Sequence, residues 1–304
     1  KSPRELPAMR KPLPKSARVV VLGGGVVGCS VAYHLTKVGI TDVILLERKQ
    51  LTSGTTWHAA GLVGQLRGSQ NMTKLAKYTA ELYRALEAET GQATGFKQNG
   101  SISIATTAGR FEELKRMASM AKVFDLPVDV LTTDQVAECY PLITIEDVIG
   151  AIGIPSDGQT NPVDVTQALT KGARNGGAQI FEDTEVTALH RQRDRITGVS
   201  TEYGDIAADV VVICGGMWSR ELAASVDVHI PLHACEHYYI VTEAIADLPK
   251  DLPVLRDYDA YTYYKEDAGK ILLGAFEPKS KPWGMDGVPE SFCFDELPYD
   301  FDHF

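Results

Sequence analysis

The sequence predicts an α/β fold that opens with a parallel strand–helix–strand unit, and three observations carry this prediction. A short apolar run, residues 19–22, is followed by a glycine-rich segment, 23–28, and then by apolar positions at helical spacing that stop at Gly39. A second apolar run, 43–46, has the composition of a strand buried on both faces. A third such run, 208–213, is also expected to form a buried strand.

The glycine-rich segment fits the pattern G-x-G-x-x-G, and each spaced glycine has a physical reason. Gly23 permits the tight turn, Gly25 lets the backbone approach a pyrophosphate, and Gly28 lets helix and strand pack closely. The helix that follows offers N–H groups and a partial positive charge to phosphates. Glu47 ends the second strand, where its carboxylate can accept hydrogen bonds from ribose hydroxyls. Because all these parts agree, the sequence predicts a bound dinucleotide rather than an ordinary glycine turn.

Glu47, at the end of the second strand, also narrows the identity of the bound dinucleotide. It favours a ribose without a 2′-phosphate, and so FAD or NAD over NADP. Arg48 follows immediately, and it is either a ligand of a 2′-phosphate or a surface arginine in water. We favour the surface arginine, and we count Arg48 among the residues close to the cofactor.

The loop at residues 53–62 is the most informative stretch of the chain. It places Trp57-His58 among small residues just after the acidic strand end. The small residues let the backbone lie against a cofactor, and Trp57 can anchor the loop. We expect the loop to emerge near the pyrophosphate and to run toward a flavin ring, where a neutral His58 imidazole is a competent nucleophile. The alternative is that His58 only hydrogen-bonds the cofactor.

The remaining elements follow from apolar spacing and from turn residues. Helices are expected at 71–89, at 109–124, and from Pro162 to about residue 174, where Gly176-Gly177 ends the last of them. Strands are expected at 101–104, 178–181, 185–189 and 235–243, and a hairpin at 261–264 and 271–274 around the loop 266–269.

In these residues the chain resembles the sarcosine dehydrogenase and dimethylglycine dehydrogenase family. The members of this family are flavoenzymes of the D-amino-acid-oxidase-like fold. The resemblance covers nearly all of residues 13–304, and its specific part is the segment Leu51–Leu62 with its Trp-His-Ala-Ala-Gly-Leu ending. It implies a Rossmann-like FAD-binding domain with an interleaved substrate domain built on a mixed or antiparallel sheet. It also implies that His58 carries the flavin through a covalent bond to the 8α carbon. Further matching segments are 89–91, 99–102, 140–142, 214–218 and 252–257.

The resemblance also implies a set of cofactor-binding residues. Val186 falls where the family contacts the adenine through backbone atoms, and Gly215-Gly216 where backbone approaches the flavin pyrophosphate, unless these glycines form a simple tight turn. The expected set is Gly23, Gly25, Gly28, Glu47, Arg48, Ser53, Thr55, His58, Val186, Gly215 and Gly216.

His237 and Tyr263 are the expected catalytic residues, since relatives keep a histidine before one strand and a tyrosine in the next hairpin. Tyr261 lies one strand period away and competes with Tyr263. An N-methyl amine transfers hydride only as the free amine, so a residue that titrates at about pH 6.5, as histidine does, can accept the ammonium proton. The alternative is that His237 is a packed sheet histidine.

The resemblance therefore implies FAD-dependent demethylation of sarcosine or dimethylglycine, with electrons passing to an acceptor such as an electron-transfer flavoprotein. Two alternatives stay open. One is a regulatory flavoprotein without catalysis, like the regulatory subunit of pyruvate dehydrogenase phosphatase, which lacks the Trp-His pair. The other is an oxidase that uses oxygen directly.

Composition excludes several classes of protein. The formal net charge of −10 argues against a nucleic-acid partner. The sequence contains no apolar run long enough to span a membrane. The five cysteines form no C-x-x-C pair, which indicates a reducing compartment, the bacterial cytoplasm or alternatively the mitochondrial matrix, and no zinc site. His229, His233 and His237 are spaced by four, but Pro231 argues against a shared helical face and hence against a metal site.

The expected domain organisation has five parts. They are a flexible lead-in at 1–17, a first FAD-binding part at 18–110, an insertion at 111–150, a second FAD-binding part at 151–225, and a truncated substrate domain at 226–304. We expect the chain to be the N-terminal part of a longer protein, because the segment up to Phe304 continues without a break in relatives.

Overall fold

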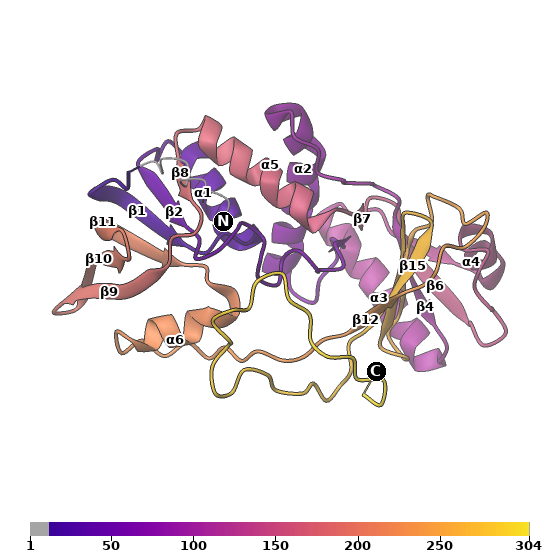
Figure 1. The fold of residues 1–304 in the computed structure, drawn as a ribbon. Coiled ribbons are helices and arrows are strands. Elements are labelled where there is room, and N and C mark those ends of the chain that lie inside the picture. The colour runs from indigo at the N-terminus through magenta and orange to yellow at the C-terminus, as the bar shows by residue number, and fades with distance from the viewer. Residues whose placement is uncertain (1–11, 304) are drawn as a thin grey trace, which may run out of the picture. The chain divides into compact units, whose positions relative to one another are not determined.

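The computed structural model describes residues 12–303, which form two compact units (Figure 1). The first unit contains the chain up to Gly54 and the segment Leu169–Leu232. The second contains Thr55–Ala168 and the chain from His233 onward. Each unit is therefore built from two separate stretches of sequence, which is the interleaving that the predicted α/β fold class requires.

The division between the units differs from the predicted domain boundaries. Residues 55–110 and 151–168, expected in the FAD-binding domain, belong to the second unit. The reason is strand pairing between distant segments, which local patterns do not encode: β4 (Ser101–Ala105) pairs with β6 (Gly150–Ile154) on one side and with β13 (Val254–Asp257) on the other. The predicted lead-in at 1–17 lies mostly outside the described residues, and β1 already begins at Ser16.

The first unit is organised around a six-stranded sheet in the order β8-β2-β1-β11-β10-β9 (Figure 1). The first four strands in this order are parallel to one another, and β10 and β9 continue as an antiparallel meander. Val20, Ile44 and Ile206 lie in its buried core. The strand bounds are β1 Ser16–Leu22, β2 Val43–Leu46, β8 Gln179–Phe181, β9 Val186–Gln192, β10 Arg195–Thr201 and β11 Gly204–Ile213.

The predicted strand–helix–strand unit at the start of the chain is confirmed. The prediction for the strand at 208–213 needs one correction. Helix α1 spans Val26–Lys37 between β1 and β2, and Gly39 follows it with φ +86°. The strand expected to be buried, β11, is central because β1 and β10 hydrogen-bond to its two edges. Its side chains are nevertheless only partly covered, and Val210 is 49% exposed. Apolar composition indicated a strand here correctly but overstated its burial.

The second unit contains a seven-stranded sheet in the order β12-β15-β14-β13-β4-β6-β5. The predicted hairpin is confirmed as β14 (Thr262–Asp267) and β15 (Lys270–Ala275), joined by Ala268 and Gly269 with φ of +52° and +80°. Two positive φ values are typical of a two-residue hairpin turn of type I′. Strand β12 is shorter than predicted, Tyr239–Val241, because Cys235 pairs instead with Pro282 in an isolated bridge.

The helices agree with the predicted spans. Helix α2 begins after Ser69, whose hydroxyl accepts a hydrogen bond from the Met72 amide, and it ends at Gly91 with φ +64°. Such capping satisfies backbone groups that the helix itself leaves unpaired. The remaining bounds are α2 Gln70–Thr90, α3 Ala108–Ala121, η1 Lys122–Phe124, α4 Thr133–Cys139, α5 Pro162–Asn175, η2 Gly216–Trp218, α6 Ser219–Ala224, with short strands β3 Leu62–Val63, β5 Asp129–Leu131 and β7 Gly158–Gln159.

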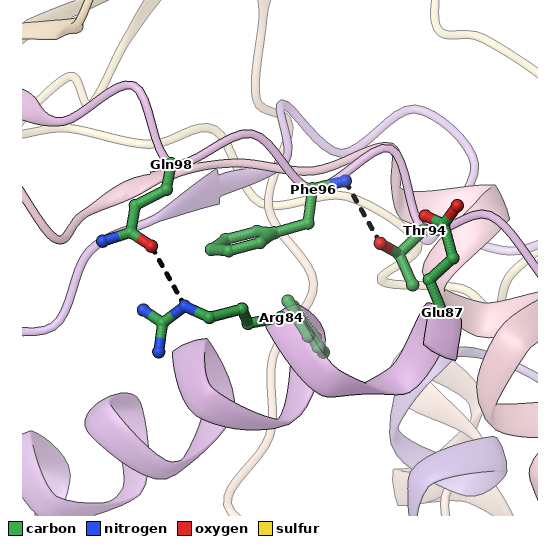
Figure 2. A pocket seen from close by; sticks show the side chains of 6 residues that line it. Arg84, Glu87, Thr94, Phe96 and Gln98 are labelled. Atoms are coloured by element: carbon green, nitrogen blue, oxygen red, sulfur yellow. Dashed lines mark hydrogen bonds between the residues drawn. The ribbon is translucent and has the colours of Figure 1, made fainter. Parts of the chain in front are cut away.

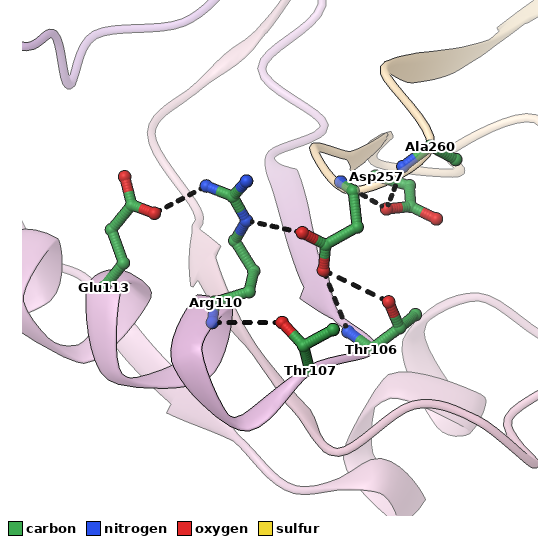
Figure 3. Close-up of polar contacts among 7 residues, drawn as sticks. Thr106, Thr107, Arg110, Glu113, Asp257 and Ala260 are labelled. Atoms are coloured by element: carbon green, nitrogen blue, oxygen red, sulfur yellow. Dashed lines mark hydrogen bonds and ion pairs between the residues drawn. The ribbon is translucent and has the colours of Figure 1, made fainter.

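A charged network ties the start of α3 to the turn between β13 and β14 (Figure 3). Asp259 accepts from Arg110 Nε at 3.0 Å and from the Thr106 hydroxyl at 3.1 Å. Arg110 also pairs with Glu113 at 2.6 Å, and Asp257 accepts from the Asp259 amide at 2.9 Å. The network therefore fixes the end of the strand that carries Arg256. Across residues 12–303, no helix is long and apolar enough to cross a membrane.

Candidate functional site

The glycine turn after β1 is packed against backbone on two sides. Gly23 adopts φ +111°, and a Cβ there would lie 2.4 Å from the Cys214 carbonyl oxygen. A Cβ on Gly28 would lie 1.9 Å from the Gly23 carbonyl oxygen. Gly25 is the extended residue just before α1. The turn at 23 and 28 therefore accepts only glycine, and it leads straight into a helix N-terminus, which is the arrangement that binds phosphate.

Glu47, at the end of β2, is buried beside this turn. Its Oε2 accepts a hydrogen bond from the Gly24 amide at 2.6 Å, and its Oε1 accepts from the Lys49 amide at 2.9 Å. Burial raises the pKa of Glu47, while the two amide hydrogen bonds favour the charged form. Each carboxylate oxygen keeps capacity for another donor. Glu47 thus combines a fixed position against the turn with free acceptor capacity for ribose hydroxyls.

Arg48 lies over the indole of Trp218, with its guanidinium carbon 4.3 Å from the ring centroid. This cation–π contact orients the half-buried Arg48 side chain within the first unit. The loop that follows β2 also begins next to the glycine turn after β1. The Thr52 amide donates to the Gly24 carbonyl at 3.0 Å, and Ser53 is buried.

Gly215 and Gly216 follow β11 and begin η2. A Cβ on Gly23 would lie 3.2 Å from the Gly215 Cα, so the two glycine segments are neighbours in the first unit. Val186 is the first residue of β9 and packs at the margin of the buried core. A glycine turn with no room for side chains, a helix N-terminus and a fixed carboxylate fit the dinucleotide part of FAD.

The Trp57-His58 pair belongs to the second unit. The two rings stack with centroids 4.7 Å apart and an interplanar angle of 28°, and Phe294 packs edge-on against Trp57 at 6.0 Å. Burial lowers the pKa of His58, although the charge of Glu296 works against this. The imidazole is therefore neutral at pH 7 and keeps a lone pair. Trp57 Nε1 is buried and has no hydrogen-bond partner among the described residues.

The segment after His58 lies on one face of the seven-stranded sheet. Lys265 of β14 donates from Nζ to the Ala60 carbonyl at 2.9 Å. A Cβ on Gly64 would lie 2.9 Å from Nη2 of Arg256 in β13. Tyr263 lies two residues before Lys265 and directly opposite Arg256 in the strand register, so all three side chains share this face. The loop of His58 and the strand of Tyr263 are thus held together.

His237 and Tyr263 meet, as their predicted roles require. The Tyr263 hydroxyl lies 3.4 Å from His237 Nε2, and the imidazole stacks on Phe276 with centroids 5.0 Å apart. Burial raises the pKa of Tyr263 to about 12, and the nearby Tyr239 and Glu277 add to this. The hydroxyl is therefore protonated at neutral pH. Gly274 makes the contact possible, because a Cβ there would lie 2.2 Å from the Tyr263 hydroxyl.

Glu277 lies on the other side of His237. Its Oε2 is 3.7 Å from His237 Nδ1, and its Oε1 is 3.2 Å from His303 Nε2. A carboxylate on Nδ1 favours the tautomer that carries its proton there, which leaves the Nε2 lone pair facing Tyr263. Residues 12–303 contain no group of three or more ligands that could hold a metal ion.

Several residues that the sequence offered for the site lie apart from His237 and Tyr263. Tyr261 is 50% exposed, has φ +59° and precedes β14, whereas Tyr263 is buried within that strand. Thr55 is exposed. His229 and His233 lie outside the helices, and neither joins His237 in a cluster of ligands.

A separate pocket of about 210 Å³ lies between α2 and the strand-like segment that follows it (Figure 2). Arg84 Nε donates to Gln98 Oε1 at 3.0 Å across it, and Tyr83 and Phe96 pack edge-on beside it. No predicted site residue lines this pocket.

Sequence reasoning did not single out Lys265, Arg256 or Glu277, which the structure places beside predicted site residues. Alternation along the predicted hairpin was a usable signal for Lys265, because residues two apart in a strand share a face with Tyr263. Arg256 lay in a segment that matched the family, but its neighbours depend on register. Nothing in the local sequence pointed to Glu277.

The chain matches curated proteins over nearly all of its length. It is 42% identical over 293 residues to 4-methylaminobutanoate oxidase (formaldehyde-forming) of Paenarthrobacter nicotinovorans, covering 96% of this chain and 35% of that protein. It is 38% identical over 300 residues to mitochondrial sarcosine dehydrogenase of Mus musculus, covering 97% and 32%. It is also 39% identical over 295 residues to the mouse mitochondrial pyruvate dehydrogenase phosphatase regulatory subunit, covering 96% and 34%. The chain spans about a third of the length of these relatives.

Among solved structures, L-proline dehydrogenase from P. horikoshii superposes with a TM-score of 0.84 at 25% identity, covering 96% of this chain and 75% of that one. This neighbour and the relatives confirm the predicted fold and the predicted resemblance to sarcosine and dimethylglycine dehydrogenases. The family model described as FAD dependent oxidoreductase matches residues 18–298. The chain therefore belongs to the FAD-dependent oxidoreductase family.

Proposed function

We propose that the protein oxidatively demethylates a small N-methylated amino acid, and that this chain supplies its flavin-binding and amine-binding parts. The observation that carries the proposal is the contact of Tyr263 with His237 on the same sheet face as the loop of His58. A protonated tyrosine and an imidazole lone pair can together accept the proton of a substrate ammonium group. FAD, when bound, accepts the hydride.

We propose FAD attachment through His58. The support is chemical, because a neutral imidazole with an available lone pair is a nucleophile. Precipitating the FAD-loaded protein with acid tests this. The flavin should stay in the pellet for the parent and for a control, His233→Ala, in which an exposed histidine is removed. His58→Ala should release it to the supernatant, and release from the folded, active parent would refute the attachment.

A panel of amines tests the reaction. Sarcosine, dimethylglycine and 4-methylaminobutanoate are each mixed anaerobically with the FAD-loaded protein, and bleaching of the flavin absorbance is followed. Reduction by at least one of them is expected. A regulatory flavoprotein would show no bleaching with any member. The chain is similar both to enzymes and to a regulatory subunit. Flavin bleaching by the amines therefore distinguishes an enzyme from a regulatory flavoprotein.

The electron acceptor is a separate part of the proposal. We propose an acceptor protein such as an electron-transfer flavoprotein rather than oxygen. Mixing the reduced protein with oxygen in a stopped-flow instrument tests it, and slow reoxidation is expected. Rapid reoxidation by oxygen would make the protein an oxidase. The cytoplasmic location stays a prediction.

A further inference from the structure

We propose that Glu277 is a positioning residue that acts through His237. Its carboxylate keeps the proton of the neutral imidazole on Nδ1, and it stabilises the imidazolium that forms when His237 takes the proton of the amine. This inference rests on the proposed function, because it concerns the proton transfer at the same site. It is carried by the contacts on the two nitrogens of His237 and by the surroundings of Glu277.

His237 is contacted at both of its ring nitrogens. The Tyr263 hydroxyl lies 3.4 Å from Nε2, and Glu277 Oε2 lies 3.7 Å from Nδ1. Phe276, the residue before Glu277, stacks on the imidazole at an interplanar angle of 19°. The Phe276 amide donates to the Tyr261 carbonyl at 2.8 Å, which continues the pairing of the hairpin beyond β15. The backbone that carries Glu277 is therefore fixed beside His237.

The carboxylate decides which nitrogen of His237 carries the proton. A neutral imidazole has one N–H group and one lone pair, whereas a carboxylate only accepts hydrogen bonds, so the N–H faces Glu277. The lone pair then remains on Nε2, where the Tyr263 hydroxyl can donate to it. Burial raises the pKa of Tyr263 to about 12, so this hydroxyl keeps its proton at neutral pH. The separation of 3.7 Å exceeds a hydrogen bond, and such contacts are often long in unliganded catalytic sites and shorten when substrate binds.

The proton transfer places a full charge opposite Glu277. The ammonium group of the amine gives its proton to the Tyr263 oxygen while the Tyr263 hydroxyl gives its own proton to Nε2. One N–H bond of the amine breaks and one N–H bond forms on the imidazole, so the positive charge moves from the amine to His237. A carboxylate within about 4–6 Å favours the charged form of a histidine. Glu277 therefore makes His237 a stronger proton acceptor.

The surroundings of Glu277 leave its charge available to His237. Its side chain is 19% exposed, and its other oxygen, Oε1, lies 3.2 Å from His303 Nε2. Among residues 12–303, the ion-pair partners of Glu277 are these two histidines, and neither is a permanent cation. The nearby Lys281 pairs instead with Asp300 and Glu236.

His303 holds the carboxylate from the other side. Its amide donates to Asp300 Oδ1 at 3.1 Å, and its ring packs edge-on against Tyr238 with centroids 6.1 Å apart. Tyr238 in turn donates to Glu236 at 2.5 Å. His303 is thus tied to a polar group of its own and gives Glu277 a fixed second contact.

The first test does not require activity. Carbon NMR of the FAD-loaded, histidine-labelled protein in alkaline buffer reports which ring nitrogen carries the proton, and His237→Ala identifies the signal of His237. The proton is expected on Nδ1 in the parent, and Glu277→Leu should move part of it to Nε2. A parent with the proton on Nε2 would overturn the proposal, and so would the same tautomer ratio in parent and variant.

The second test follows anaerobic flavin reduction by the best amine of the panel across a pH series. Glu277→Gln keeps the shape of the side chain and should slow reduction about tenfold near neutral pH, because an opposite charge at this distance changes proton affinity by about that factor. The loss should shrink at high pH, where the free amine dominates, and Glu277→Asp should recover part of the rate. Weaker binding of the amine with an unchanged reduction rate would place Glu277 on the substrate instead and overturn the proposal.

A double variant separates action through His237 from damage to the fold. In the background of His237→Ala, Glu277→Gln should cause no further loss, whereas an independent role would add its own. His303→Gln should cost less than Glu277→Gln, and Glu243→Gln, at an exposed glutamate of the same unit, should match the parent. If the tautomer of His237 depends on Glu277 but no amine reduces the flavin, the proposed function fails while the positioning of His237 by Glu277 stands.

Discussion

Lys265 donates a hydrogen bond to the backbone carbonyl of Ala60 at 2.9 Å, across 205 positions of sequence. Lys265 is buried and also pairs with Asp267 at 3.3 Å. Through this bond the strand of Tyr263 holds the loop that carries His58. The position of the proposed flavin-attachment residue therefore depends on a lysine that no motif marks.

Replacing Lys265 by Met should loosen this loop. The Ala60 carbonyl loses a charged donor, so the free energy of unfolding should fall by about 1–3 kcal/mol. Urea denaturation measures the loss, and limited proteolysis should show faster cleavage within 55–61. Lys279→Met, at an exposed lysine, is the matched control and should change neither. Equal proteolysis of the two variants would show that the bond does not hold the loop.

Glu47→Gln should weaken FAD binding. The variant keeps the shape of the side chain but loses its charge, and with it charge-assisted acceptance from ribose hydroxyls that is worth about 1.5–3 kcal/mol. Titration of the apoprotein with FAD, with His58→Ala present in every variant so that the flavin binds reversibly, should show an increase in Kd of about tenfold or more. Glu202→Gln removes an exposed charge from the same unit and should leave Kd unchanged. An unaltered Kd in Glu47→Gln would refute the ribose assignment.

His237→Ala should slow flavin reduction in a pH-dependent way. At neutral pH most of the substrate is protonated, so loss of the proton acceptor should matter most there. The loss should shrink at high pH, where the free amine already dominates. Anaerobic stopped-flow reduction across a pH series measures this. A loss of the same size at every pH would indicate that His237 only packs against Tyr263 and Phe276.

Asp259→Asn should destabilise the protein in a way that depends on pH. The pKa of Asp259 lies below its ordinary value, since hydrogen bonds from Arg110 and Thr106 outweigh the opposing effect of burial. The stabilisation is therefore complete above about pH 4 and is lost as the pH falls through the lower pKa of the folded protein. Parent and variant should differ by about 1 kcal/mol at pH 7 and converge in acid.

Urea denaturation between pH 3 and pH 7 tests this convergence. Asp286→Asn, at an exposed aspartate, is the control and should follow the parent at every pH. A gap between parent and Asp259→Asn that persists unchanged in acid would mean that the ion pair with Arg110 does not cause it.

The sequence by itself determined the parts of this protein that depend on local physical chemistry. The glycine turn, the apolar strands of the first unit, α1 and the hairpin of Tyr263 all follow from backbone freedom and side-chain periodicity, which neighbouring residues fix. The fold class and the resemblance to flavoenzymes followed from these elements together with the Trp57-His58 loop.

Only the tertiary structure decided what depends on pairing between distant segments. The partition into units follows from β4 pairing with β13, and the partial exposure of β11 depends on what covers its faces. The face on which Tyr263 and Lys265 stand, and the placing of Arg256 opposite Tyr263, depend on strand register. Register is set by contacts across the whole sheet, and a shift of one residue would turn each of these side chains to the other face.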